Sequence, residues 1–172
     1  MGLPLLGVSR FSRQTLAGGS YGLLANDDFT PRPDYFAALA YVRLAGARVL
    51  NVSLDAGVEA SLRVYARCSA AALGLPPGSL TLAFINVDAD ITFSIAVPGL
   101  AAGASRADYV LAPLGGNDLA STLTLNGAPL AAVGNDAPAL VGTTGDAAEP
   151  VLAAPHTFGY IVYSGAGAQA CM

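Results

Sequence analysis

A single change of hydrophobic period, at Gly46, constrains the fold more than any other feature of this sequence. Before it, Tyr35, Leu39 and Val42 recur with the i, i+4, i+7 spacing of one helix face. After it, apolar and other side chains alternate, as on strands with one buried face. The sequence therefore predicts one helix at residues 33–45, opened by a proline that suits the first helical turn, and a β region behind it.

The β region consists of short alternating segments separated by turn signals. Asn126-Gly127 predicts a tight hairpin turn, because both residues tolerate positive φ. Residues 134–155, rich in Gly, Ala and Pro, are expected to form a long loop. Such a pattern is typical of an antiparallel β-sandwich. The predicted strands are residues 49–54, 62–68, 80–87, 91–97, 109–114, 119–125, 130–133 and 158–162.

The segment before the helix predicts a strand at residues 10–16 and a glycine-rich turn at residues 17–22. A lone strand–loop–helix unit cannot bury both of its faces, whereas residues 47–172 suffice for a sandwich. Such a unit is what remains when a (β/α) barrel is cut before its last strand. We therefore expect two parts, a barrel remnant at residues 1–46 and a sandwich at residues 47–172.

Charge and hydropathy exclude several classes of function. The net charge is −4, without a basic block, so nucleic acid is not an expected partner. No apolar run reaches the roughly 18 residues that a membrane span needs. Residues 1–8 lack the basic region and the cleavage site of a signal peptide. The abrupt start leads us to expect a fragment of a longer protein.

The acidic residues do not predict a catalytic pair. The only glutamates, Glu59 and Glu149, lie in separate turn-like segments. Retaining glycosidases need two carboxyl groups about 5–5.5 Å apart, which nothing in this spacing provides. Asp27-Asp28 and the Asp88–Asp90 pair are expected to shape turns, since the later ligands of a calcium loop are missing.

Nucleophiles and metal ligands are equally sparse. There is no G-x-S-x-G motif, and the single histidine, His156, is expected to be structural. Together with Cys68 and Cys171 it is too little for a zinc site, and no metal or cofactor is predicted. The residues alone leave open whether the cysteines pair or are two separate buried thiols. Pairing would close a loop of about 100 residues and contribute roughly 4–5 kcal/mol.

Several motifs, in the same order along nearly the whole chain, resemble the heparanase-like glycoside hydrolases of family 79, with the plant-type members most similar. The specific part is residues 12–24 (SRQTLAGGSYGLL) and residues 29–36 (FTPRPDYF). The further matching segments are residues 43–46, 49–50, 62–68 (LRVYARC), 80–82, 85–86, 109–111, 113–115, 125–127 and 170–171.

The resemblance implies a (β/α)8 barrel with a C-terminal β-sandwich, and a retaining β-glucuronidase that acts on heparan sulfate or arabinogalactan-type glycans. It implies that Gly19 and Tyr21 bind the carboxylate of the glucuronide in the −1 subsite, in a pocket that Gly18 and Gln14 help to line. It also implies a Cys68–Cys171 disulfide. The compartment would be extracellular, cell-wall, lysosomal or vacuolar, with membrane association in some members.

Two further features bear on such a compartment and on activity. Asn51-Val52-Ser53 is an N-glycosylation triplet, although its expected place on a strand argues against modification. Both catalytic glutamates of the family lie on earlier barrel strands, so this chain is expected to be inactive alone. Its partner would then be the missing barrel portion of the parent enzyme.

Two alternatives stay open from the sequence. The chain could be a non-catalytic module that binds glycans or proteins through its sandwich, although Tyr65 is the only candidate for an aromatic platform. It could also be an accessory chain that completes a barrel supplied by another polypeptide, with the Tyr35, Leu39 and Val42 stripe as its docking face.

Overall fold

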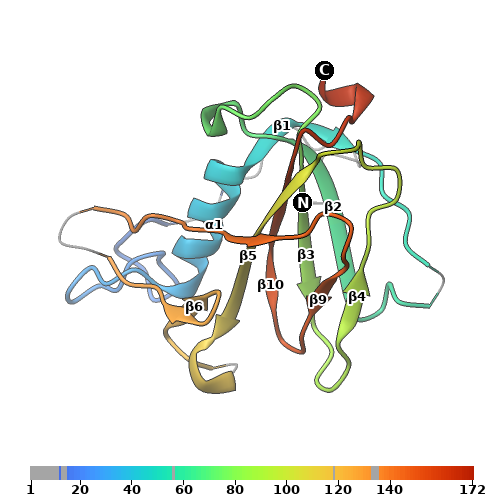
Figure 1. Cartoon of the computed structure of the whole chain (residues 1–172). Coiled ribbons are helices and arrows are strands. Elements are labelled where there is room, and N and C mark those ends of the chain that lie inside the picture. Colours follow the sequence, from blue (N-terminus) through green and yellow to red (C-terminus); the bar gives the residue numbers. More distant parts are fainter. Residues whose placement is uncertain (1–11, 13–14, 56, 118, 133–135) are drawn as a thin grey trace.

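The computed structural model describes residues 12, 15–55, 57–117, 119–132 and 136–172. It is mainly β, with antiparallel sheets and one α-helix, as predicted (Figure 1). The elements are α1 (Pro33–Leu44), β1 (Ala45–Leu50), β2 (Leu62–Ser69), β3 (Leu80–Asn86), β4 (Phe93–Ile95), β5 (Ser105–Pro113), β6 (Leu123–Leu125), β7 (Ala128–Pro129), β8 (Thr143–Gly145), β9 (Val151–Ala153) and β10 (Phe158–Ser164). Most of the strand predicted at residues 10–16 lies outside the described residues.

The larger sheet has the strand order β1-β2-β3-β10-β5-β6-β7, with β8 also paired to β5. Its centre is β10, which pairs antiparallel with both β3 and β5. The backbones of β10 and β5 approach closely at Gly159, where a Cβ would stand 2.4 Å from the carbonyl oxygen of Tyr109. Only glycine fits there, so this residue fixes the middle of the sheet.

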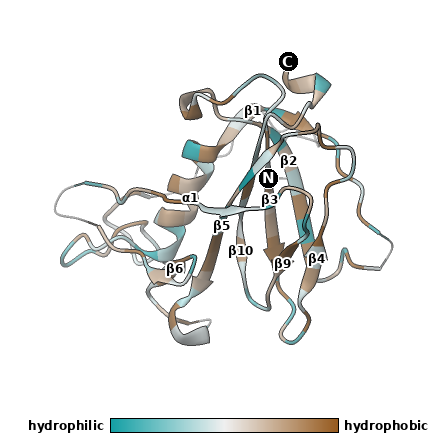
Figure 2. Cartoon of the chain, viewed as in Figure 1, coloured by the Kyte–Doolittle hydropathy of each residue, from teal (hydrophilic) through white to brown (hydrophobic). Residues whose placement is uncertain are grey.

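Both faces of the larger sheet are covered. On one face, the two-stranded sheet of β4 and β9 contributes Ile95, Val151 and Ala153 to a core shared with β2, β3 and β10. On the other face, α1 packs into a second core (Figures 1 and 2). Because β3 lies between the two cores, it is buried along nearly its whole length and does not alternate in burial as an exposed strand would.

The helix matches its predicted range to within one residue, but its buried face is a different one. Phe36, Ala40 and Leu44 are at most 2% exposed, whereas Val42 is 72% exposed. Tyr35 and Leu39 lie at the margin of the buried face, packed against the same core. The large sheet selects this face, because the small side chain of Ala40 lets the helix lie close to β10.

Two strand predictions and one loop prediction need correction. The strand predicted at residues 49–54 ends at Leu50, and the return strand predicted at 130–133 is β7, two residues earlier. Residues 134–155 are not one loop, because they contain β8 and β9. Each of these two strands has three residues and pairs with a strand distant in sequence, β5 or β4. Such pairings depend on tertiary contacts and leave little local pattern.

The helix continues into the sheet without a linker, since α1 ends at Leu44 and β1 begins at Ala45. The last helical carbonyl, on Leu44, accepts hydrogen bonds from the amide of Ala70 (3.0 Å) and from Oγ1 of Thr81 (2.9 Å). Gly46 then crosses β2 so closely that a Cβ would meet the carbonyl oxygen of Cys68 at 2.6 Å. The end of the helix is therefore satisfied by the sheet itself.

Arg67 on β2 also stabilises the junction between α1 and β1. Its Nη1 donates to the carbonyl oxygens of Gly46 (2.9 Å) and Ala47 (3.2 Å), and its guanidinium lies 5.3 Å from the centre of the Tyr41 ring. The residue is only 7% exposed. One buried cation thus connects α1, β1 and β2.

The C-terminus is fixed to the sheet by the disulfide that the resemblance implied. Cys68 and Cys171 are bonded, with their Cα atoms 5.4 Å apart and a sequence separation of 103. The carbonyl oxygen of Cys171 also accepts a hydrogen bond from the amide of Gly78 (2.8 Å). The chain end is therefore held at the beginning of β3 and at the end of β2.

Candidate functional site

The loop that precedes α1 is ordered by its own backbone. Two of its hydrogen bonds join residues 15–16 to residues 23–24, from Leu23 N to Thr15 O (3.0 Å) and from Leu24 N to Leu16 O (2.9 Å). A third, from Arg32 N to Leu23 O (2.9 Å), joins the loop to the residue before the helix. We call residues 15–32 the glycine loop. Its position is set by α1, which the large sheet holds.

The tip of the glycine loop is a tight turn closed by a hydrogen bond from Gly22 N to Gly19 O (3.0 Å). Gly18 has φ +89°, a conformation that disfavours other residues. Two side chains hold this tip. Asn26 Oδ1 accepts from the amide of Gly18 (3.1 Å), and Arg32 Nη1 donates to the carbonyl oxygen of Ser20.

Three of the four predicted substrate-binding residues therefore lie together. Gly18 and Gly19 form the turn, and Tyr21, which follows, is 57% exposed. Gln14 lies outside the described residues. Backbone amides and a phenol hydroxyl can donate hydrogen bonds to a carboxylate or to sugar hydroxyls, but they cannot supply acid–base or nucleophilic carboxyl chemistry.

Four of the carboxylate residues, Glu59, Glu149, Asp28 and Asp88, lie in turns. Glu59 Oε2 accepts from the amide of Gly57 (3.1 Å), and Glu149 closes a turn with Asp146. Asp28 accepts from the amide of Thr30 (2.9 Å), and hydrogen bonding to Thr30 lowers the pKa of this carboxyl. Asp88 Oδ1 accepts from two backbone amides in the β3–β4 turn, which lowers its pKa as well. The carboxylates of Glu59, Asp28 and Asp88 thus each stabilise their own turn, and Glu149 takes part in its turn through its backbone amide.

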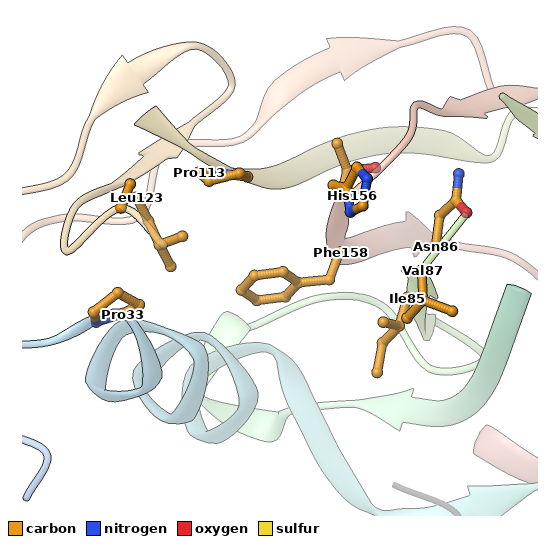
Figure 3. Close-up of a pocket in the computed structure, with 10 residues that line it drawn as sticks. Pro33, Ile85, Asn86, Val87, Pro113, Leu123, His156 and Phe158 are labelled. Carbon is orange, nitrogen blue, oxygen red and sulfur yellow. The ribbon is translucent and has the colours of Figure 1, made fainter. Parts of the chain in front are cut away.

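An open apolar pocket of about 350 Å³ lies beside the start of α1, and sequence reasoning did not anticipate it. Figure 3 shows the ring of Phe158 pointing toward Pro33 and Leu123, with His156 at the other side. His156 has φ +52° and donates its amide to the carbonyl oxygen of Asp88 (3.2 Å). The residues that line the pocket come mainly from the ends of separate strands. No local sequence pattern predicts that these strand ends lie together.

The glycosylation triplet does not lie on a strand, contrary to the expectation from its alternating pattern. β1 ends at Leu50, and Asn51 begins an irregular segment in which it is exposed. The objection that the sequence raised against its modification therefore does not hold.

The described residues contain no group of three or more His, Cys, Asp or Glu side chains that could hold a metal ion. None of the helices in this part of the chain is long and apolar enough to cross a bilayer.

Comparison with known proteins identifies relatives of one kind, although no family model matches the sequence. Baicalin-beta-D-glucuronidase of Scutellaria baicalensis is 32% identical over 158 residues, which are 91% of this chain and 29% of the relative. Hyaluronoglucuronidase of Hirudo nipponia is 32% identical over 165 residues, 92% of this chain and 32% of the relative. Heparanase of Gallus gallus is 31% identical over 170 residues, which are 96% of this chain and 32% of the relative.

The chain thus spans about a third of the length of the relatives it matches. The matched stretches nevertheless cover more than nine tenths of this chain. On these similarities the chain belongs to the heparanase-like family of glycoside hydrolases.

Proposed function

We propose that this chain is the C-terminal part of a retaining β-glucuronidase that hydrolyses O-glycosyl bonds in glucuronide-containing glycans of the proteoglycan or arabinogalactan type. The observation that carries the proposal is the ordered tip of the glycine loop, Gly18–Tyr21, held at the start of α1 by Asn26 and Arg32. The family membership supports it, as do two relatives that are named as glucuronidases.

In this proposal the tip recognises the sugar, and the chemistry is supplied elsewhere. The backbone of Gly19 and the hydroxyl of Tyr21 donate to the carboxylate of the glucuronide in the −1 subsite, beside Gln14. Retention requires an acid/base carboxyl and a nucleophile about 5–5.5 Å apart. Glu59 and Glu149 are each bound into separate turns, so the catalytic pair would come from the part that the longer relatives possess. The chain alone would be inactive.

The same proposal assigns the architecture. Residues 1–46 would be the last strand–loop–helix unit of a (β/α)8 barrel, with the glycine loop at the face where barrel enzymes build their active sites. Residues 47–172 would be the β-sandwich, formed by the large sheet and by the β4–β9 sheet. The disulfide suits an extracellular, cell-wall, lysosomal or vacuolar compartment.

A chromogenic β-glucuronide tests the proposal. The assay compares the 172-residue chain with a chimera in which the remaining portion of baicalin-beta-D-glucuronidase is joined to it. We expect hydrolysis only by the chimera. Tyr21→Phe in the chimera should raise KM for the glucuronide more than for the matching glucoside, since the hydroxyl is proposed to contact the carboxylate. Tyr65→Phe on β2 serves as the control.

Hydrolysis by the 172-residue chain alone would contradict the proposal, and Glu59→Gln and Glu149→Gln would then be assayed. Equal effects of Tyr21→Phe on glucuronide and glucoside would contradict the role given to Tyr21.

A further inference from the structure

The segment that follows β1 presents a modification triplet in an accessible form. Val52 and Leu54 pack against the core beneath the β4–β9 sheet, whereas Asn51 and Ser53 are exposed. Burial therefore alternates along this extended stretch, and residues two apart lie on the same side. The side-chain amide of the asparagine and the hydroxyl of the serine both face solvent.

The backbone around the triplet is not committed to a sheet. The register of β1 with β2 ends at the pair Leu50 and Ala66, and residues 51–55 belong to no helix or strand. Among the described residues, the side chain of Asn51 has no hydrogen-bond partner. A modifying enzyme would therefore break no side-chain hydrogen bond of this residue, and a bulky group could remain on its exposed side chain in the folded state.

A second observation concerns the compartment. The disulfide joins Cys171 to Cys68, and disulfides persist in the oxidising compartments through which N-glycosylated proteins pass. Asn51-Val52-Ser53 is the only Asn-x-Ser/Thr triplet in the sequence, and its middle residue is not proline. The acceptor pattern and the redox chemistry point to the same secretory route.

We propose that Asn51 carries an N-linked glycan. In the transfer, Nδ2 of Asn51 attacks C1 of an oligosaccharide carried on a lipid pyrophosphate. The new C1–N bond forms as the C1–O bond to the pyrophosphate breaks, Nδ2 loses one proton, and the lipid pyrophosphate leaves. The lipid-linked oligosaccharide is the only co-reactant.

The position gives the glycan a physical consequence. Among the described strands β1 pairs with β2 alone, and it is the outermost strand at its end of the large sheet. Unpaired strand edges promote association with other chains, and bulky or charged groups suppress it. A glycan at the end of β1 would stand beside this edge, where Arg48 is the neighbouring exposed charge.

The test uses the whole chain behind a secretion signal in a eukaryotic host. The secreted protein is treated with an amidase that removes N-glycans in water enriched in heavy oxygen, so that a glycosylated Asn51 becomes a labelled aspartate in mass spectrometry. We expect label at Asn51 and none elsewhere. On a denaturing gel the glycosylated chain should migrate more slowly than the amidase-treated chain. Asn51→Gln and Ser53→Ala should abolish this difference, and Ser53→Thr, a matched change that keeps the hydroxyl, should retain it.

Synthesis in the presence of microsomal membranes gives the same readout if the chain is not exported. Translocated, disulfide-bonded protein with an unlabelled Asn51 would overturn the proposal. The thermal midpoint of Asn51→Gln should equal that of the deglycosylated parent, since the exposed side-chain amide has no hydrogen-bond partner among the described residues. A lower midpoint would show a structural role for the residue instead. Neither result depends on glucuronidase activity, so this inference can fail while the proposed function stands.

Discussion

Removing the buried cation under the helix–strand junction should destabilise the protein substantially. In Arg67→Met the aliphatic stem keeps its packing, but the hydrogen bonds to the carbonyl oxygens of Gly46 and Ala47 are lost, as is the contact with the Tyr41 ring. Hydrogen bonds from a charged donor contribute about 1.5–3 kcal/mol each. A desolvated cation–π contact contributes about 2 kcal/mol.

The sum of these terms overstates the loss, because Nε of Arg67 is buried without a hydrogen-bond partner and its desolvation already costs stability. We therefore expect the free energy of unfolding to fall by about 2–4 kcal/mol. With a urea m-value near 2 kcal/mol/M, the midpoint should fall by about 1–2 M.

Urea unfolding followed by far-ultraviolet circular dichroism measures this change. The matched control is Arg63→Met on the same strand, because Arg63 is exposed and bonds only to the carbonyl oxygen of the preceding residue (3.3 Å). Its midpoint should stay within about 0.3 M of the parent. If Arg67→Met unfolds at the same urea concentration as Arg63→Met, the junction does not depend on this cation.

Three further predictions concern stability. Burial raises the pKa of Asp108, which is paired with Arg106 at 3.0 Å. The folded protein therefore loses stability as pH rises from the ordinary pKa of an aspartate through this raised pKa, because the carboxyl must ionise while buried. Asp108→Asn should therefore flatten the fall in thermal midpoint above about pH 4, and an unchanged slope between pH 4 and 7 would count against this assignment. Gly46→Ala should lower the free energy of unfolding by about 1–3 kcal/mol in urea titration, because its Cβ would stand 2.6 Å from a carbonyl oxygen; an unaltered midpoint would show that β1 can shift. Cys171→Ser should cost about 4 kcal/mol under non-reducing conditions, and a midpoint equal to that of the parent would show that the bond does not constrain the unfolded chain.

The parts of the fold that were predictable have strong local signals. The helix has its proline start and apolar spacing, β2 has clear alternation, and Asn126 at φ +49° begins the expected hairpin turn. β8 and β9 were missed because three-residue strands are specified by their partners. The buried helix face was missed for a similar reason, since Phe36 and Leu44 are selected by the sheet they meet.

The candidate site divides in the same way. Composition and spacing gave only a glycine-rich turn at residues 17–22, and the roles of Gly19 and Tyr21 came from the family resemblance. The structure adds what holds that turn, namely Asn26 and Arg32, whose side chains bond backbone groups eight and twelve residues away. No periodic pattern encodes such contacts.

The direct passage of α1 into β1 has a consequence for how this chain can tolerate insertions and deletions. One residue added at Ala45 would turn the helix by about 100° about its axis relative to the strand. Phe36 would then leave the core, and the glycine loop would be carried to another side of the helix. Changes of length should therefore accumulate elsewhere, such as in the exposed turns around Gly57 and Gly103, while the spacing from Tyr21 to Leu50 stays constant among functional relatives.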